Sequence, residues 1–224
     1  MSSEDVEMHW IPKAVIFFVH TKEEKDKLVY HHICDDLSPN EIREAKIFLF
    51  VGQKYTGKTT AINAFFNIVK GINFKSPERF ILINEPEEQN NKKYTFGIHL
   101  YYLKDSDKNP LIIIDSEGYG SKAKDLEINK AFEFVFRDVI NHINIICLTE
   151  YFTNIRFTLF MKYIYQAVTG LFADDIKDNF IVFLTHSYHC SDMKNPHVIE
   201  NIIMNSGGSW IFEKPKYVMV EFIW

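Results

Sequence analysis

One short segment carries the clearest chemistry in the sequence. It reads Gly-Gln-Lys-Tyr-Thr-Gly-Lys-Thr from Gly52 to Thr59 and matches the pattern G-x-x-x-x-G-K-[ST]. Its glycines let the backbone wrap closely around a phosphate, and successive N–H groups at a helix N-terminus donate hydrogen bonds to that phosphate. Lys58 would place a positive charge against the β- and γ-phosphates, and the Thr59 hydroxyl would ligate Mg²⁺. The predicted phosphate-binding residues are Gly52, Gln53, Lys54, Tyr55, Thr56, Gly57, Lys58 and Thr59.

The elements on either side of this loop are those that the motif requires. An apolar run, Lys46–Val51, predicts a strand that leads into the loop, and Lys58–Lys70 predicts an amphipathic helix that leaves it. Gly71 is placed to end that helix. The helix face that we expect to pack on a sheet consists of Ala61, Ala64, Phe65, Ile68 and Val69.

A carboxylate at the tip of a second apolar run gives the next signal. Leu111–Ile114 predicts a buried strand, and Asp-Ser-Glu-Gly follows directly as residues Asp115–Gly118. A buried carboxylate needs a partner, and bound Mg²⁺ is the natural one. We expect Asp115 to hold the metal through a water molecule and the Gly118 N–H to sense the γ-phosphate. A loop pinned by the γ-phosphate is released when that group leaves, so the two motifs together predict a switch.

The elements that position these motifs follow an α/β pattern. From residue 45 onward short apolar runs alternate with helical periodicity, which predicts a mostly parallel central sheet between helices, in three layers. The predicted strands are Lys46–Val51, Gly97–Leu103, Leu111–Ile114, Asn144–Leu148, Asn179–Leu184 and Lys216–Ile223. Ala131–Ile143 and Ile155–Phe172 predict further helices whose inward residues are Phe132, Val135, Val139, Phe160, Ile164 and Val168.

The sequence divides into an N-terminal extension, residues 1–40, and one large domain, residues 41–224. Within the extension, Ala14–Val19 could be an added strand, and the charged run Lys22–Lys27 is typical of a solvated turn or helix face. We assign no chemistry to the extension.

Composition excludes several classes of function. The 30 acidic residues outnumber the 25 basic ones, giving a net charge of -5, and no dense basic block is present, so we expect no nucleic-acid partner. The three cysteines are far apart and fit neither a disulfide framework nor a zinc finger, which favours a cytoplasmic location. The apolar runs are too short for a membrane helix, so any contact with a membrane would be made through a partner.

At this point the motifs resemble those of the translation-factor-related class of P-loop GTPases. Within that class they are similar to the septin-like branch, which includes immune-associated (AIG-type) proteins and chloroplast import receptors. The resemblance covers about residues 45–224 and rests on the two motifs, on Thr60–Phe65 after the first, and on Asp175–Asn179 with Thr185–His186 near the end. The D-S-E-G wording also resembles the D-T-E-G of guanylate-binding proteins and atlastins, so the branch stays open.

The resemblance implies further site residues. Thr60 joins the nucleotide contacts, and Thr95 matches the switch threonine that closes on Mg²⁺, where it would act with Lys58 and Gly118 in catalysis. The usual N/T-K-x-D for guanine is replaced by Thr-His-Ser-Tyr, so the resemblance implies that His186 and Glu221 contact the base. A carboxylate is sought because guanine presents two adjacent donors that adenine lacks. Asp192 is the alternative carboxylate.

The same resemblance implies how the protein would work. Tyr119 replaces the glutamine that orients water in related GTPases, so GTP hydrolysis should be slow. A second copy of the chain is implied across the nucleotide, in a nucleotide-dependent homodimer. The last helix of the family's G domain is missing after Lys216–Ile223. We therefore expect a Mg²⁺-dependent guanine-nucleotide switch that binds GTP and GDP. Two alternatives stay open, which are a nucleotide-binding scaffold that does not hydrolyse and a P-loop ATPase. A third, a nucleotide or small-molecule kinase, is disfavoured because the sequence has few arginines to clamp a transferred phosphoryl group.

Overall fold

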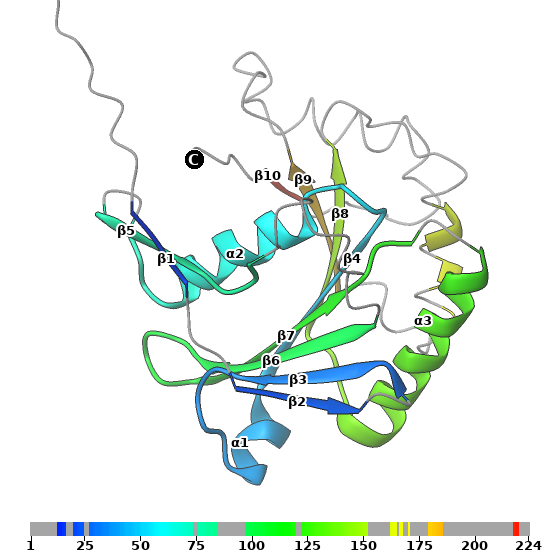
Figure 1. Ribbon diagram of the computed structural model, residues 1–224, viewed down its shortest axis with the longest axis horizontal. Helices are drawn as coiled ribbons and strands as arrows, with labels where there is room; N and C mark the ends of the chain where they lie inside the picture. Colours follow the sequence, from blue (N-terminus) through cyan, green and yellow to red (C-terminus); the bar gives the residue numbers. More distant parts are fainter. Residues whose placement is uncertain are drawn as a thin grey trace, which may run out of the picture.

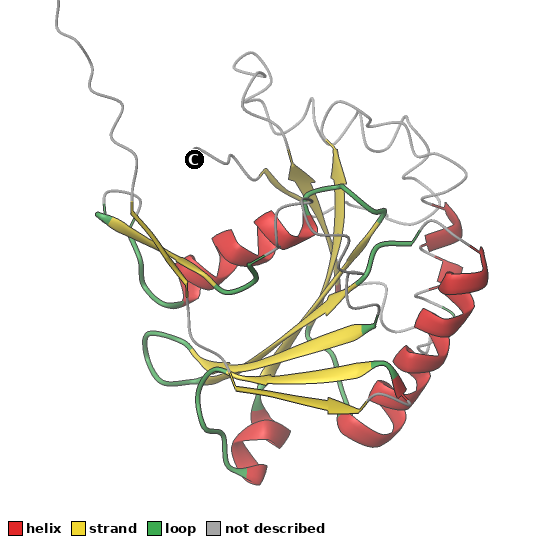
Figure 2. Ribbon diagram, viewed as in Figure 1, coloured by secondary structure: helices red, strands yellow, loops and turns green. Residues whose placement is uncertain are grey.

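The computed structural model describes residues 13–16, 20–24, 27–73, 76–84, 97–119, 122–151, 162–164, 166, 167, 170, 179–185 and 217–219, with backbone only for 122–124 and 217–219. Their centre is an eight-stranded sheet in the order β10-β9-β8-β4-β7-β6-β3-β2 (Figures 1 and 2). The strands are β2 (His20–Glu24), β3 (Val29–Ile33), β4 (Lys46–Gly52), β6 (Ile98–Lys104), β7 (Pro110–Ser116), β8 (Ile145–Tyr151), β9 (Phe180–Thr185) and β10 (Tyr217–Met219).

Most neighbouring strands run parallel. The pairs β6–β7 and β2–β3 are antiparallel, and the other five pairs in the sheet are parallel. Parallel neighbours require crossovers, and helices α2 (Lys58–Val69) and α3 (Lys122–Phe134) lie on opposite faces of the sheet (Figure 2). This confirms the predicted three-layer α/β fold. That the final helix of the domain is missing stays a prediction.

Each face of the sheet has its own apolar layer. On the face covered by α3, side chains such as Leu49, Ile114 and Phe132 are fully buried. On the face covered by α2, Phe50, Ile62 and Phe66 are fully buried. The two layers hold β4 in the middle of the molecule, so the residues that follow its end are held by a rigid strand.

Helix α2 buries part of the predicted face. Ala61 is buried, and Phe65 and Val69 are partly buried against the core, as expected. Ile68 is 70% exposed, however, and the fully buried apolar residues include Ile62 and Phe66. The physical reason is that two asparagines of α2 turn toward β5 (Glu78–Ile81) and its continuation.

Asn63 and Asn67 act as substitutes for a neighbouring strand. Asn63 Oδ1 accepts from the backbone N–H groups of Leu82 and Ile83, both at 2.9 Å, and its Nδ2 donates to Ile83 O at 2.9 Å. Asn67 binds the backbone N–H and C=O of Phe80 in the same way, at 2.8 and 2.7 Å. These bonds satisfy buried backbone groups and fix the helix rotation.

Part of the N-terminal extension belongs to the main sheet. β3 pairs with β6, and β2 forms the edge, so the prediction of a turn or helix at Lys22–Lys27 is wrong for residues 22–24. Alternating charge suits an edge strand because charged side chains discourage pairing with another chain. β1 (Lys13–Ile16) overlaps the predicted strand Ala14–Val19 but pairs with β5 in a separate two-stranded sheet. The division at residue 40 stays a prediction.

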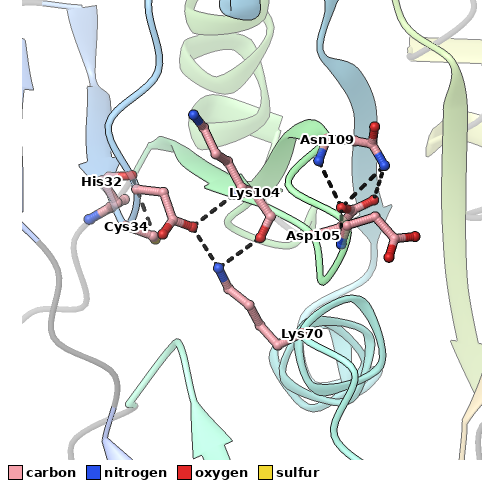
Figure 3. A network of polar contacts seen from close by, with 8 residues as sticks. His32, Cys34, Lys70, Lys104, Asp105 and Asn109 are labelled. Atoms are coloured by element: carbon pink, nitrogen blue, oxygen red, sulfur yellow. Dashed lines mark hydrogen bonds and ion pairs between the residues drawn. The ribbon is translucent and has the colours of Figure 1, made fainter.

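A polar network fastens this N-terminal part to α2 (Figure 3). Lys70, directly after α2, donates to Asp35 Oδ2 at 2.6 Å and to Lys104 O at 2.8 Å. The Lys104 N–H donates to the same Asp35 oxygen at 2.8 Å, and beside it Asp105 and Asn109 close the turn before β7. The short helix α1 (Pro39–Glu44) then leads into β4, with Ser38 and Glu41 forming a capping box at its start.

The other helices differ from prediction mainly in where they begin and end. Helix α3 begins at Lys122, nine residues before the predicted Ala131, and ends in a π-helical turn, Val135–Val139. The sequence pattern does not reveal the first residues of α3, because an apolar residue, Leu126, lies on the exposed face of the helix. It is 63% exposed and interrupts the helical spacing of apolar residues. In the predicted helix Ile155–Phe172, residues 162–164, 166 and 167 are helical and Ile164 is buried. Phe160 and Val168 lie outside the described residues.

Candidate nucleotide-binding site

The phosphate-binding loop lies between the end of β4 and the start of α2. Gly57 has a φ of 81° and directly precedes the helix, a left-handed conformation that glycine adopts without steric cost. Tyr55 has a φ of 67° and is 81% exposed, so a bulky residue accepts the same strain within the loop. Tyr151 Oη donates to Tyr55 O and holds that turn. A Cβ on Gly52 would lie 2.5 Å from Thr149 O, so only glycine fits where β4 ends.

Lys58 is the first residue of α2, and its side chain turns back to the loop. The residue is 7% exposed, and Nζ donates to Gln53 O at 2.8 Å. Thr56 Oγ1 donates to the same carbonyl oxygen at 2.9 Å. The first turn of α2, which includes Thr59 and Thr60, carries no acidic residue and no side-chain cap. Its N–H groups and the positive end of the helix dipole therefore favour an anion.

The D-S-E-G segment is bound directly to this loop. The Tyr119 N–H donates to Gly52 O at 3.1 Å, and the Lys54 N–H donates to Tyr119 O at 3.3 Å. A Cβ on Gly118 would collide with the backbone of Lys54 and lie 2.6 Å from Lys58 Nζ. The structure thus brings Gly118 and Lys58 together, the two residues for which the sequence predicts contact with the γ-phosphate.

The donor set of the site fits Mg²⁺. Asp115 lies in β7, directly beside Phe50 of β4, the strand that leads into the loop. Tyr101 belongs to the apolar layer on the face of the sheet that α2 covers. Its pKa is raised first by burial and then by the negative charge of Asp115, which indicates that the Asp115 carboxylate faces the same side. A carboxylate from Asp115 and a hydroxyl from Thr59 are hard oxygen ligands, which Mg²⁺ prefers together with water and phosphate. Within the described residues no cluster of His, Cys, Asp and Glu could hold another metal.

Two residues that were not predicted as site residues, Thr185 and Glu150, lie next to the loop at the ends of β9 and β8. Thr185, the last residue of β9, donates from Oγ1 to Thr56 O at 2.8 Å and to Glu150 O at 3.1 Å. Glu150, near the end of β8, is 7% exposed. Burial raises the pKa of its carboxyl group to about 7, while a backbone hydrogen bond from Tyr151 and the charge of Lys58 act in the opposite direction. The sequence contains one indication of this role, because both residues lie at the carboxyl ends of neighbouring parallel strands, where ligands bind in α/β sheets.

Tyr119 points away from the loop. It is fully buried, and its Oη donates to Asn129 Oδ1 of α3 at 3.1 Å. Its ring also packs edge-on against Tyr163. The side chain that replaces the glutamine of related GTPases is therefore part of the core beneath α3.

Several predicted site residues lie outside the described part of the chain. They are Thr95, His186, Asp192 and Glu221. The contact of Thr95 with the metal and the contacts of His186 and Glu221 with the base therefore stay predictions. Among the helices that the structure describes, none combines the length and apolar character needed to cross a membrane.

Comparison with solved structures identifies the fold. No protein-family model and no curated protein matches the sequence. A structure concerning the GTPase activity of the chloroplast translocon components atToc33 and psToc159 aligns with a TM-score of 0.53 and 14% identity over 80% of this chain and 71% of that one. Toc33 from Arabidopsis thaliana in complex with Mg²⁺ and GMPPNP aligns with a TM-score of 0.50 and 15% identity over 81% and 72% of the two chains. The chain therefore has the fold of a P-loop GTPase G domain.

Proposed function

We propose that this protein is a Mg²⁺-dependent guanine-nucleotide switch that hydrolyses GTP slowly. The observation that carries the proposal is the packing of Gly118 against Lys54 and Lys58, because it joins the phosphate loop to the segment that follows β7. The similarity in fold to Toc33 in complex with Mg²⁺ and GMPPNP supports the same ligand class. The chain is proposed to belong to the translation-factor-related GTPases, in the branch with AIG-type and import-receptor proteins.

The residues of the chain divide the work of binding. Lys58 Nζ leaves Gln53 O, to which it donates at 2.8 Å, and binds the β- and γ-phosphates. The backbone N–H groups of the loop and of the first turn of α2 bind the phosphate oxygens. The Gly118 N–H binds the γ-phosphate. When hydrolysis removes that phosphate, the segment after β7 is released. Thr59 and Asp115 would hold Mg²⁺, which supplies charge neutralisation at the phosphates when it is bound.

Slow turnover follows from the position of Tyr119. Its hydroxyl is bound to Asn129 in the core, so it does not orient water at the γ-phosphate. We propose that a second copy of the chain completes the site, as a nucleotide-dependent homodimer. Dimerisation is important for GTPase activity in the translocon components atToc33 and psToc159, which supports this arrangement. His186, Glu221 and Thr95 are proposed to complete base and metal binding, in a protein of the cytoplasm.

A thermal-shift experiment tests the proposal. The purified chain is melted with Mg²⁺ and GTP, GDP or ATP, alongside Lys58→Ala and the control Lys104→Met, whose ion pair with Glu41 lies at the opposite end of the sheet. A ligand at 100 times its dissociation constant adds about 2.7 kcal/mol to the free energy of unfolding, which is a rise of several degrees in Tm. We expect GTP and GDP, but not ATP, to stabilise the wild type and Lys104→Met, and none to stabilise Lys58→Ala. No shift with any nucleotide would refute nucleotide binding, and a shift with ATP alone would select the ATPase.

The burial of Tyr119 also favours a second candidate, a scaffold that binds GTP without hydrolysing it. Phosphate release at several protein concentrations separates the two. Turnover that increases per molecule with concentration supports the dimeric GTPase. Binding without any phosphate release selects the scaffold.

A further inference from the structure

An ion pair joins the phosphate loop to the segment after β7. Lys54 Nζ donates to Glu117 Oε1, and the two side chains are 35% and 15% exposed. The pair lies beside the predicted position of the terminal phosphate, because Gly118 follows Glu117 and its backbone touches that of Lys54 and approaches Lys58 Nζ. The Lys54 side chain is therefore a second cation at this end of the loop, in addition to Lys58.

Among the residues that the structure describes, Lys54 is the one hydrogen-bond partner of the Glu117 carboxylate. Its other oxygen, Oε2, is buried and accepts no hydrogen bond from any residue that the structure describes. A buried carboxylate that is only half satisfied is costly, so its position is stabilised chiefly by the charge of Lys54. Glu117 also donates its backbone N–H to Gly97 O at 3.2 Å, just before β6 begins. A movement of Glu117 would therefore affect the loop, the segment after β7 and the residue that precedes β6.

We propose that the Lys54–Glu117 pair is a latch that responds to the γ-phosphate and gives the site its preference between triphosphate and diphosphate. This inference rests on the nucleotide binding proposed above. A diphosphate is held by the loop backbone and Lys58, and Lys54 stays with Glu117. A triphosphate places a more highly charged anion beside Lys54, which then binds phosphate oxygen and releases Glu117. Glu117 and the γ-phosphate thus compete for one ammonium group.

Titration calorimetry with GMPPNP and with GDP, both with Mg²⁺, tests this competition in the full chain. Lys54→Met should lower the affinity for GMPPNP about tenfold or more, the usual effect of losing one charge-assisted hydrogen bond, and leave the affinity for GDP within about twofold. Glu117→Gln should raise the affinity for GMPPNP about threefold, because the competing charge is removed. Lys54→Arg should keep the wild-type preference. Lys104→Met, which breaks an ion pair of 2.6 Å far from the loop, should match the wild type for both nucleotides.

The opposite directions of the two main variants separate a latch from a structural support. If Lys54→Met and Glu117→Gln weaken both nucleotides equally, the pair only stabilises the loop and the proposal is wrong. It is also wrong if Lys54→Met, shown to be folded by circular dichroism, keeps the wild-type ratio of GMPPNP to GDP affinity. A wild-type chain that binds neither nucleotide would refute the proposed function itself, and the latch with it.

Discussion

Replacing Glu150 by glutamine should reveal a carboxyl group that stays protonated in the folded protein up to about pH 7. Burial raises its pKa from 4.5 to about 7. Between these two values the folded state holds a proton that the unfolded state has lost, so the free energy of unfolding falls as the pH rises. One pKa unit corresponds to 1.36 kcal/mol, and the difference therefore amounts to about 3 kcal/mol between pH 4.5 and pH 7.5.

Glutamine has the shape and hydrogen-bonding groups of the neutral acid but does not lose a proton. Glu150→Gln and the wild type should therefore be about equally stable at pH 4.5, and the variant should be about 3 kcal/mol more stable at pH 7.5. Urea unfolding of the nucleotide-free proteins at four pH values across this range measures the difference. Glu44→Gln is the matched control because its side chain is exposed on α1. A difference between wild type and Glu150→Gln that stays constant with pH would refute the buried, neutral carboxyl group.

Three further variants test other parts of the structure. Asn63→Leu removes three hydrogen bonds to the backbone of Leu82 and Ile83 and should cost about 3 kcal/mol in urea unfolding, whereas a loss below about 0.5 kcal/mol would show that water replaces them. Tyr55→Gly relieves the φ of 67° and should stabilise the nucleotide-free protein by about 1 kcal/mol in thermal unfolding; a lower Tm would contradict this. Burial, then the charges of His99 and His31, lower the pKa of His32 from 6.5 to about 4. The contribution of neutral His32 to the free energy of unfolding is therefore complete above pH 6.5 and is lost as the pH falls toward 4. His32→Phe should therefore lose less stability than the wild type between pH 6.5 and 4.5, and equal losses would refute this.

The sequence predicts the parts of the fold that local patterns determine. β4, the phosphate loop and α2 follow one another without a gap, and each is recognised within a few residues by its apolar period or its glycines. The strand before Asp115 is recognised in the same way. The structure accordingly places these elements within one to two residues of their predicted ends.

The contacts that the sequence does not predict join residues far apart in the chain. Thr185 binds Thr56 across 129 positions, and Lys54 binds Glu117 across 63. A threonine or lysine gives no local sign of its partner, because the pairing depends on strand order rather than on spacing. The role of Asn63 is hidden for a related reason. An asparagine in a helix normally indicates a solvated face, whereas here it satisfies the backbone groups of Leu82 and Ile83.

Thr185 connects the phosphate loop to the end of β9, the strand that precedes the predicted base-binding residue His186 in the sequence. Its hydroxyl is bound to Thr56 O within the loop, and a Cβ on Gly57 would lie 3.4 Å from its methyl group. His186 is the next residue in the sequence. The carbonyl of Glu150 is bound to the same hydroxyl. One hydroxyl therefore joins the end of β8 to the phosphate loop. Under the proposed function, a preference for guanine would not require a complete T-K-x-D motif, because the residue directly before His186 in the sequence is bound to the phosphate loop.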